Sequence, residues 1–167
     1  MIELMVVLAL LAVLASVAAP SLGSFIASRR VEDTAKRLGS DLVLARNEAV
    51  KRNAAVLVCA DASVTDSSCN ATPAAVDWAK GWRVCFDGDG DGSCDAGATT
   101  DPNPIRQQAA VSASLNLTGP LSRIRFNPNG TLTASALTTF NVASATATAP
   151  RWLVRFAATG ATSVRKE

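Results

Sequence analysis

The first 27 residues of the chain form one nearly continuous apolar segment. Apolar residues run without a break from Leu4 to Ala15, and after Pro20 they resume up to Ala27. A helix from Ile2 to Ala27 would be about 39 Å long at about 1.5 Å per residue, and the hydrocarbon core of a bilayer is about 30 Å thick. The pattern therefore predicts a single membrane-crossing helix. Pro20 lacks a backbone N–H, so we expect it to bend this helix or open it locally.

The segment that follows continues the helix but changes its character. Apolar residues recur at spacings of three and four, the period of a helix with one apolar face. They are Val31, Ala35, Leu38, Leu42, Ala45 and Ala49, while charged residues such as Asp41 are expected on the other faces. We expect the helix to end near Asn53. The chain thus divides into an apolar helical half, 1–27, and an amphipathic half, 28–53, which needs a partner on one side only.

Residues 54–167 have the pattern of strands and turns rather than of helices. Short β-rich runs alternate with turn signals made of Asp, Gly, Asn and Pro. The strand candidates are Ala55–Cys59, Gly81–Phe86, Ile105–Val111, Ser122–Asn127, Thr138–Val142 and Trp152–Ala157. We therefore expect an α+β fold with a lollipop outline, in which a head of antiparallel sheets packs against the apolar stripe of the long helix.

Glu3 is the only charged residue before Arg29, and it bears on what the apolar segment does. A cleaved secretory signal peptide needs a basic start, and cleavage after Ala19 would leave Pro20 directly behind the cut. An ordinary membrane anchor explains the length but not the acid. A carboxylate in hydrocarbon costs about 2.5–3.5 kcal/mol on insertion scales. Glu3 therefore either finds a partner on another chain, such as an α-amino group, or lies at the level of the lipid headgroups.

The four cysteines of the chain are Cys59, Cys69, Cys85 and Cys94, and all lie in the β-rich part. The sequence has no His and no C-x-x-C pair, which argues against zinc and favours two disulfides in an oxidising compartment. Four cysteines allow three pairings. We expect Cys59–Cys69 and Cys85–Cys94, because each pair would close a short loop rich in turn residues.

An Asp/Gly-rich run follows Cys85 and has the pattern D-x-D-x-D-G, the first half of a calcium loop. The carboxylates are Asp87, Asp89, Asp91 and, at the ninth place of the loop, Asp95. The twelfth place, where a bidentate Glu would close the calcium shell, is Ala98. The alternative is an Asp/Gly turn without a metal, held by Cys85 and Cys94.

The run Ile2-Glu3-Leu4-Met5-Val6-Val7, followed by the apolar stretch and Pro20, resembles the N-terminal signature of type IV pilins and type II secretion pseudopilins. Three further motifs resemble the minor pilins FimT and FimU and the pseudopilin GspH. They are Leu44–Asn53 followed by Val56–Cys59, Trp78 with Gly81-Trp82-Arg83-Val84, and Phe126-Asn127-Pro128-Asn129-Gly130. The resemblance covers nearly the whole chain and implies a pilin-like fold.

The resemblance also implies assembly roles for Glu3 and Pro20. In the family, the matching glutamate neutralises the N-terminal amine of a neighbouring subunit, and the matching proline marks a kink or a segment that melts when subunits pack into a filament. A short basic leader that ends in Gly is normally cut before a Phe, which becomes the methylated N-terminus. Met1 stands where the third residue of the mature chain would be. We therefore expect the leader, the cut site and the first two mature residues to precede this sequence.

A second implied activity is DNA binding, because FimT-type pilins of naturally competent bacteria bind DNA through a basic C-terminal Gly-Arg-x-Arg motif. The segment from Gly160 to Glu167 lacks the first Arg of that motif. The candidate phosphate contacts are Arg151, Arg155, Arg165 and Lys166. The alternative is a solvated tail, and the net charge of +2 does not by itself indicate nucleic acid.

No catalytic pattern is present in the sequence, which has no His, no G-x-S-x-G and no phosphate-binding glycine loop. We therefore predict a structural protein, not an enzyme, without a cofactor unless the Asp/Gly run holds calcium. It would be anchored in the bacterial inner membrane with a periplasmic head. Through its N-terminal helix it would assemble with other pilins or pseudopilins, near the tip of a type IV pilus or type II secretion pseudopilus. DNA uptake in natural transformation is the alternative function.

Overall fold

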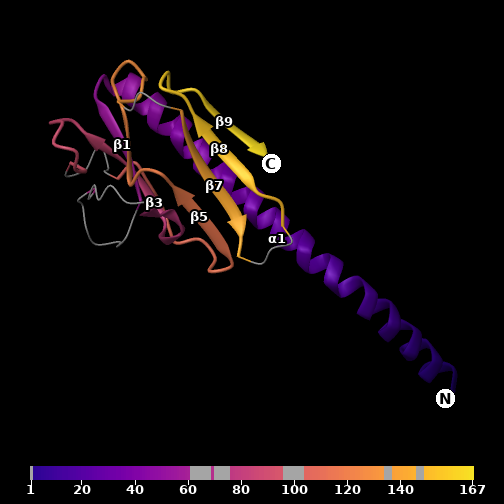
Figure 1. Ribbon diagram of the computed structural model, residues 1–167. Helices are drawn as coiled ribbons and strands as arrows, with labels where there is room; N and C mark the ends of the chain where they lie inside the picture. Colours follow the sequence, from indigo (N-terminus) through magenta and orange to yellow (C-terminus); the bar gives the residue numbers. More distant parts are fainter. Residues whose placement is uncertain (1, 61–68, 70–75, 96–103, 134–136, 146–148) are drawn as a thin grey trace.

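The computed structural model describes residues 2–60, 69, 76–95, 104–133, 137–145 and 149–167. This part of the chain contains one long helix and two antiparallel sheets, and the N-terminal half of the helix projects from the head (Figure 1). The predicted fold, a long N-terminal helix packed on antiparallel sheets, is confirmed.

Helix α1 spans Ile2–Arg52 and ends where the sequence predicts. Asn53 adopts a left-handed conformation, with a φ of 51°. Its N–H donates to the carbonyl of Val50 at 3.3 Å. The N–H of Ala54 donates to the carbonyl of Ala49 at 3.2 Å. These are the two bonds of a Schellman motif, which satisfies the last helical carbonyls and turns the chain out of the helix.

The two halves of α1 have opposite surroundings. In the first half, every described large apolar side chain from Ile2 to Leu14 is more than half exposed. In the second half, every residue of the predicted apolar stripe is fully buried, namely Val31, Ala35, Leu38, Leu42, Ala45 and Ala49. Among the described residues, no helix is both long and apolar enough to count as a membrane span.

All strand pairs in the two sheets are antiparallel. The first sheet has the order β4-β3-β1-β6. Its strands are β1 (Ala55–Ala60), β3 (Trp82–Asp87), β4 (Arg106–Gln108) and β6 (Arg123–Phe126). The second sheet has the order β2-β5-β7-β8-β9. Its strands are β2 (Val76–Asp77), β5 (Leu115–Gly119), β7 (Thr138–Ser144), β8 (Trp152–Phe156) and β9 (Thr162–Lys166), and the short 3-10 helix η1 (Trp78–Lys80) follows β2.

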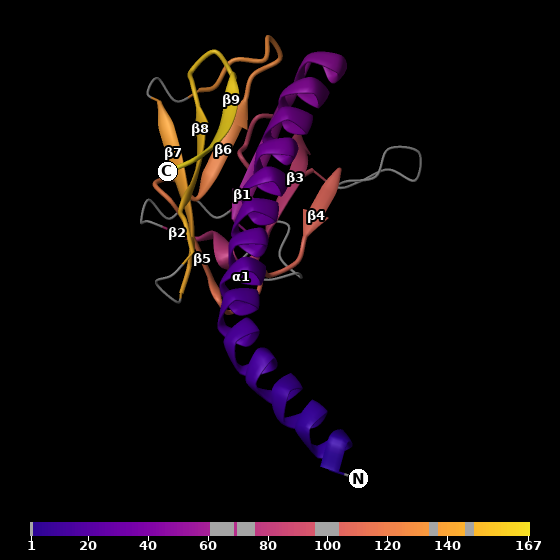
Figure 2. The same ribbon diagram turned by 90° about the vertical axis from the view of Figure 1, so that its right-hand side faces the viewer.

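The second half of α1 lies across both sheets (Figure 2), so that helix and sheets share one core. In β5 the inward side chains alternate with exposed ones: Leu115 and Leu117 are buried, and the residues between and after them are exposed. Strands β1 and β3 are instead buried at nearly every position. Three aromatic side chains pack together in the part of the core that lies next to the second sheet. Trp78 meets Phe140 edge to face with ring centroids 4.7 Å apart, and Phe140 lies 5.6 Å from Phe156.

A buried carboxylate on α1 joins the helix to the first sheet. Asp41 is only 2% exposed, which contradicts its predicted place on an exposed face. Its Oδ2 accepts a hydrogen bond from the indole Nε1 of Trp82 at 2.8 Å, and its Oδ1 accepts one from Nη1 of Arg106 at 2.9 Å. Because the stripe residues next to Asp41, Leu38 and Leu42, are apolar, these two directional bonds favour one rotation of the helix against β3 and β4.

Three strands were not predicted from the sequence: β2, β5 and β9. The C-terminal residues form β9, which pairs with β8 along its whole length, while the side chains of Arg165 and Lys166 stay exposed to solvent. The strand also packs on α1 at Gly39, where an added Cβ would meet Cγ2 of Val164 at 2.5 Å. Conversely, the predicted strand over 105–111 is reduced to β4, whose pairing with β3 ends at Gln108.

Candidate functional sites: assembly helix, disulfide cluster and basic sheet face

Glu3 lies on the exposed, apolar half of α1. The next charged residue along the helix is Arg29, about 39 Å away at about 1.5 Å per residue. Within the part of the chain that the structure describes, Glu3 therefore has no basic side chain in reach. Its carboxylate can be neutralised only from outside this part of the chain, or solvated.

Helix α1 passes through Pro20 without a break and curves along its N-terminal half (Figure 2). Pro20 cannot donate a backbone hydrogen bond to the preceding turn, which weakens the helix at this point. The helix is continuous at Pro20 and is therefore not opened there, while a bend at this residue stays a prediction. The side chain of Pro20 lies outside the described residues.

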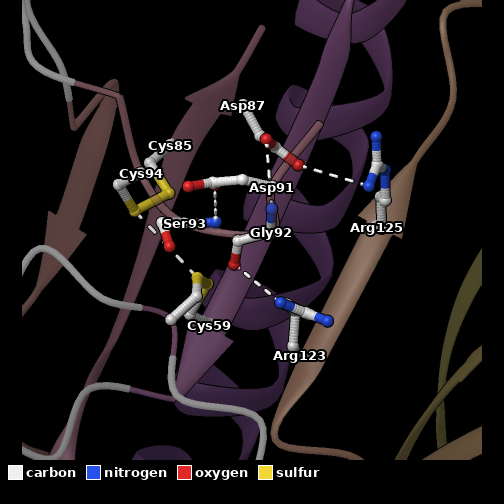
Figure 3. The surroundings of a disulfide bond; sticks show 10 residues. Cys59, Cys85, Asp87, Asp91, Gly92, Ser93, Cys94, Arg123 and Arg125 are labelled. Atoms are coloured by element: carbon white, nitrogen blue, oxygen red, sulfur yellow. Dashed lines mark hydrogen bonds and ion pairs between the residues drawn. A yellow bond between two sulfur atoms is a disulfide. The ribbon is translucent and has the colours of Figure 1, made fainter. Parts of the chain in front are cut away.

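Two disulfides are present, Cys59–Cys69 and Cys85–Cys94, with Cα atoms 5.7 and 5.4 Å apart. This is the pairing expected from the short loops between the cysteines. The two bridges lie next to each other beside the first sheet (Figure 3), and their four sulfur atoms are all within 4.8 Å of one another. With Leu57 they form a second buried cluster, separate from the main core.

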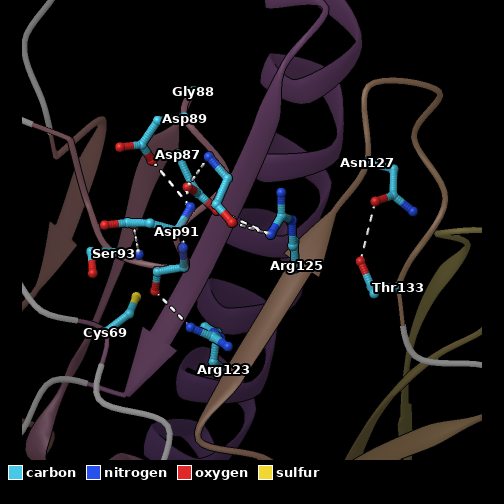
Figure 4. A network of polar contacts seen from close by, with 12 residues as sticks. Cys69, Asp87, Gly88, Asp89, Asp91, Ser93, Arg123, Arg125, Asn127 and Thr133 are labelled. Atoms are coloured by element: carbon cyan, nitrogen blue, oxygen red, sulfur yellow. Dashed lines mark hydrogen bonds and ion pairs between the residues drawn. The ribbon is translucent and has the colours of Figure 1, made fainter.

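The Asp/Gly loop after β3 is organised by its own backbone (Figure 4). Gly90 and Gly92 have φ angles of 82° and 86°, a backbone conformation that residues other than Gly rarely adopt. Each Asp of the loop accepts a hydrogen bond from a nearby backbone N–H. The donors are Gly90 and Gly92 for Asp87 at 3.0 and 3.3 Å, Asp91 for Asp89 at 3.1 Å, Ser93 for Asp91 at 2.6 Å, and Gly88 for Asp95 at 2.7 Å.

Two arginines of β6 reach across to this loop (Figure 4). Nη1 of Arg125 lies 3.5 Å from Oδ2 of the buried Asp87 and donates to the carbonyl of Gly90 at 3.2 Å. Nη1 of Arg123 donates to the carbonyl of Gly92 at 2.7 Å. The arginines thus occupy one carboxylate and two carbonyls of the candidate calcium loop. Sequence reasoning missed them, although their i, i+2 spacing on a strand places both on one face.

Three of the four candidate calcium ligands come together, since oxygens of Asp87, Asp89 and Asp95 lie within 4.8 Å of one another. The carboxylate of Asp91 is engaged by the backbone of Ser93 instead. The missing closing ligand, at Ala98, lies outside the described residues. Calcium binding by this loop stays a prediction.

The candidate DNA contacts divide between two faces of the second sheet. Residues opposite each other in an antiparallel pair place their side chains on the same face. Leu153 lies opposite Arg165 and Arg155 opposite Ser163, so Arg155 and Arg165 share one face of β8 and β9. Arg151 directly precedes β8, and its carbonyl accepts a hydrogen bond from the N–H of Glu167 at 2.9 Å, so the pairing and its alternation continue to Arg151 on the same face. Lys166 lies opposite Trp152 and therefore belongs to the other face. The predicted group of four is thus a group of three.

Comparison with known proteins places the chain in a family. The family model "Type II transport protein GspH" matches residues 34–162. Because the match covers well over half of the chain, the protein belongs to the GspH family, which includes FimT- and FimU-like minor pilins. A search of the curated proteins finds no match.

Two solved structures are similar to the fold, and both are crystal forms of the type IV minor pilin FimU of Pseudomonas aeruginosa. The first is 22% identical, covers 82% of this chain and 89% of FimU, and has a TM-score of 0.62. The second is 21% identical, covers 80% of this chain and 90% of FimU, and has a TM-score of 0.54. At this identity the likeness shows the fold: a long helix carrying two antiparallel sheets.

Proposed function

We propose that this chain is a structural minor subunit of a type IV pilus or of a type II secretion pseudopilus, located near the tip of the filament. It enters the filament by packing the first half of α1 against the helices of other subunits. The observation that carries the proposal is the exposed apolar surface from Ile2 to Leu14. Such a surface needs lipid or other apolar helices around it, because water is an unfavourable surrounding for a patch of this extent.

Before assembly, lipid is the surrounding that fits this surface. We infer that residues 1–27 anchor the subunit in the inner membrane and that the head, 54–167, lies in the periplasm. An oxidising compartment agrees with the two disulfides, both of which lie in the head. In this arrangement the protein acts through its shape and contacts, without catalysis.

Glu3 supplies the specificity of this assembly step. Its charge has no basic partner within reach on α1, and an unpaired carboxylate is costly in an apolar surrounding. The α-amino group of a neighbouring subunit can neutralise it without placing a basic side chain in the apolar segment. The attraction is stronger in the low dielectric between packed helices than in water.

The test compares Glu3→Ala with the charge-preserving Glu3→Asp in a strain that lacks the wild-type chain. We expect both variants in the membrane fraction at wild-type amounts. Glu3→Ala should be missing from sheared filaments, and Glu3→Asp should regain part of the incorporation. Wild-type incorporation of Glu3→Ala would contradict the assembly role. A strain that lacks the whole chain shows whether the subunit belongs to a pilus or to a pseudopilus. We expect this strain to lose its pili while type II secretion continues. Loss of secretion with normal pili would indicate a pseudopilus.

A second candidate function is weak DNA binding by the face of β8 and β9 that carries Arg151, Arg155 and Arg165. Three guanidinium groups on one face can contact successive phosphates, and such binding weakens as salt rises. The matched variants are Arg165→Ala and Lys166→Ala, which remove one charge each at neighbouring positions on opposite faces.

We expect Arg165→Ala, but not Lys166→Ala, to weaken a gel shift of duplex DNA by the detergent-solubilised chain at low salt. Equal losses would mean that only the total charge matters. An unchanged shift with Arg165→Ala would contradict a DNA contact on this face.

A further inference from the structure

A cavity of about 260 Å³ lies between the start of the second half of α1 and the segment that joins β4 to β5. Trp82 and Leu115, which are buried, form its inner wall. Arg30 and Arg37 of α1, the rim arginines, are exposed and line its opening. The cavity is smaller than the sites of about 300–1,000 Å³ that hold drug-sized ligands. It therefore suits a compact group that is polar on one side.

The charges around the cavity favour an anion. On the neighbouring face of α1, Glu32 forms ion pairs with both Arg29 and Lys36. The rim arginines have no ion pair within the part of the chain that the structure describes. Asp33 lines the cavity beside them, so two guanidinium groups and one carboxylate leave it with a net positive charge. A cleft with such a balance raises the local concentration of anions.

The rim arginines are spaced so that they can bind one group between them. They lie seven residues apart, which places them on the same face of the helix two turns from each other. Side chains on a helix point toward its N-terminus, so Arg37 reaches back toward Arg30. Each guanidinium donates two parallel hydrogen bonds, a geometry that matches the oxygens of a phosphate. The hydroxyl of Thr34, between them, donates to the carbonyl of Arg30 at 2.9 Å and is already used.

The position of the cavity along α1 favours a lipid headgroup as the source of the phosphate, a step that rests on the proposed membrane anchor. Arg30 comes three residues after Ala27, the end of the apolar segment, which is about 4.5 Å at about 1.5 Å per residue. The headgroup layer on each side of a bilayer is about 5–7 Å thick. The segment between β4 and β5 also lies at the end of the head from which the first half of α1 projects (Figure 2).

We propose that this cavity binds the headgroup phosphate of one anionic phospholipid. The rim arginines hold the phosphate oxygens, and the glycerol of the lipid packs against the inner wall formed by Trp82 and Leu115. Headgroup binding ties the head to the membrane surface before assembly. It fixes an orientation of the head that a single helix crossing the membrane leaves free.

The experiment uses the full chain in a nonionic detergent at low salt, titrated with a short-chain phosphatidylglycerol. Parallel titrations use a phosphatidylcholine of the same chain length and inorganic phosphate. Binding is followed by the midpoint of thermal unfolding, because a ligand that binds only the folded chain stabilises it. At 100 times its dissociation constant, phosphatidylglycerol should raise the midpoint by about 5–10 °C. The other two ligands should leave the midpoint nearly unchanged at the same concentration.

Two double variants remove the same charge at the same spacing on α1. Arg30→Gln with Arg37→Gln removes the rim arginines and should weaken phosphatidylglycerol binding about tenfold for each arginine, the least that a charge-assisted hydrogen bond contributes. Arg29→Gln with Lys36→Gln leaves the cavity intact and should bind this lipid as the wild type does. A third variant, Ala110→Phe, changes no charge but fills the opening of the cavity, and it should weaken binding as well.

Equal binding of the two phospholipids, or an equal loss in the two double variants, would overturn the proposal, because binding would then follow lipid in general or total charge. Inorganic phosphate that binds as tightly as phosphatidylglycerol would overturn the assignment to a lipid. Fractionation of the cells separates this inference from the proposed function. The variant without the rim arginines should stay in the membrane fraction, whereas a wild-type chain that is absent from this fraction would contradict the anchor itself.

Discussion

The hydrogen bonds of Asp41 allow a quantitative prediction about what holds α1 to the head. The carboxylate accepts one bond from the buried Trp82 and one from Arg106. The variant Asp41→Ala removes both acceptors and leaves the indole N–H of Trp82 buried without a partner. The variant Arg106→Ala removes only the second donor.

The two partners differ in how much they should contribute. Trp82 is 1% exposed. A hydrogen bond to a charged acceptor is worth about 1.5–3 kcal/mol, and an unsatisfied buried donor costs about 1–3 kcal/mol. The side chain of Arg106 is 53% exposed, so its ion pair is screened by solvent and is worth at most about 1 kcal/mol. The variant also removes the desolvation cost of the buried Asp41 carboxylate, which offsets part of this loss. We therefore expect Asp41→Ala to lower the free energy of unfolding by about 3 kcal/mol and Arg106→Ala by about 0.5 kcal/mol.

The assay is denaturant unfolding of the full chain in detergent, followed by tryptophan fluorescence. In a thermal scan the Asp41→Ala variant should unfold about 6–12 °C below wild type, at about 2–4 °C per kcal/mol for a chain of this size. A double-mutant cycle with Trp82→Phe should give a coupling of about 1.5 kcal/mol between Asp41 and Trp82. The reasoning is refuted if Arg106→Ala destabilises the protein as much as Asp41→Ala does, or if the coupling is absent.

Three further predictions concern stability under the same assay. Gly160→Ala should lower the free energy of unfolding by about 1–3 kcal/mol, because Gly160 has a φ of 78° and an added Cβ would meet the Gly130 carbonyl. The control is Gly23→Ala: the space around Gly23 is open, so this variant should be neutral or stabilise the protein by up to about 1 kcal/mol. Removing the bridge with Cys85→Ser and Cys94→Ser together should cost about 2.6 kcal/mol, the loop-closure entropy for a separation of 9 residues, and a loss near zero would show that the loop is held by its other bonds. The hydrogen bond from Arg52 holds the pKa of Glu48 below its ordinary value. Its contribution is therefore present above about pH 4.3, the pKa in the unfolded chain, and is lost as the pH falls through the lower folded pKa. Because the pair lies at the surface, Glu48→Gln should remove less than about 1 kcal/mol of this pH dependence.

The helix could be predicted almost completely because one period governs its second half. All six residues of the apolar stripe are buried, and Asn53 ends the helix in a conformation that Asn tolerates better than most residues. Strand β9 could not be predicted in this way. Its residues are polar or charged apart from Val164, and their order comes from pairing with β8 and from the contact with Gly39, which are long-range features.

The candidate sites show the same division between local and long-range information. The disulfide pairing followed from loop lengths, which are local. The meeting of both bridges in one cluster depends on the β1–β3 register, so the spacing of the cysteines could not predict it. Asp41 was assigned to an exposed face because helical periodicity separates apolar from polar positions. It is buried because Trp82 and Arg106, more than 40 residues away in the sequence, supply its donors.

The negative charge of the Asp/Gly loop can be balanced in two ways, by a bound calcium ion or by the arginines of β6. Oδ1 of Asp87 accepts two backbone N–H groups, Oδ2 faces Arg125, and the carbonyls of Gly90 and Gly92 accept from Arg125 and Arg123. A calcium ion takes six to eight oxygen ligands, so it would have to displace at least one guanidinium group. We therefore expect calorimetry of the wild-type chain to show no binding heat at millimolar calcium. The variant Arg125→Gln frees Oδ2 of Asp87 and is the form in which weak binding should first become measurable. Binding of one calcium ion by the wild-type chain, unchanged in Arg125→Gln, would show that the arginines do not take the place of the ion.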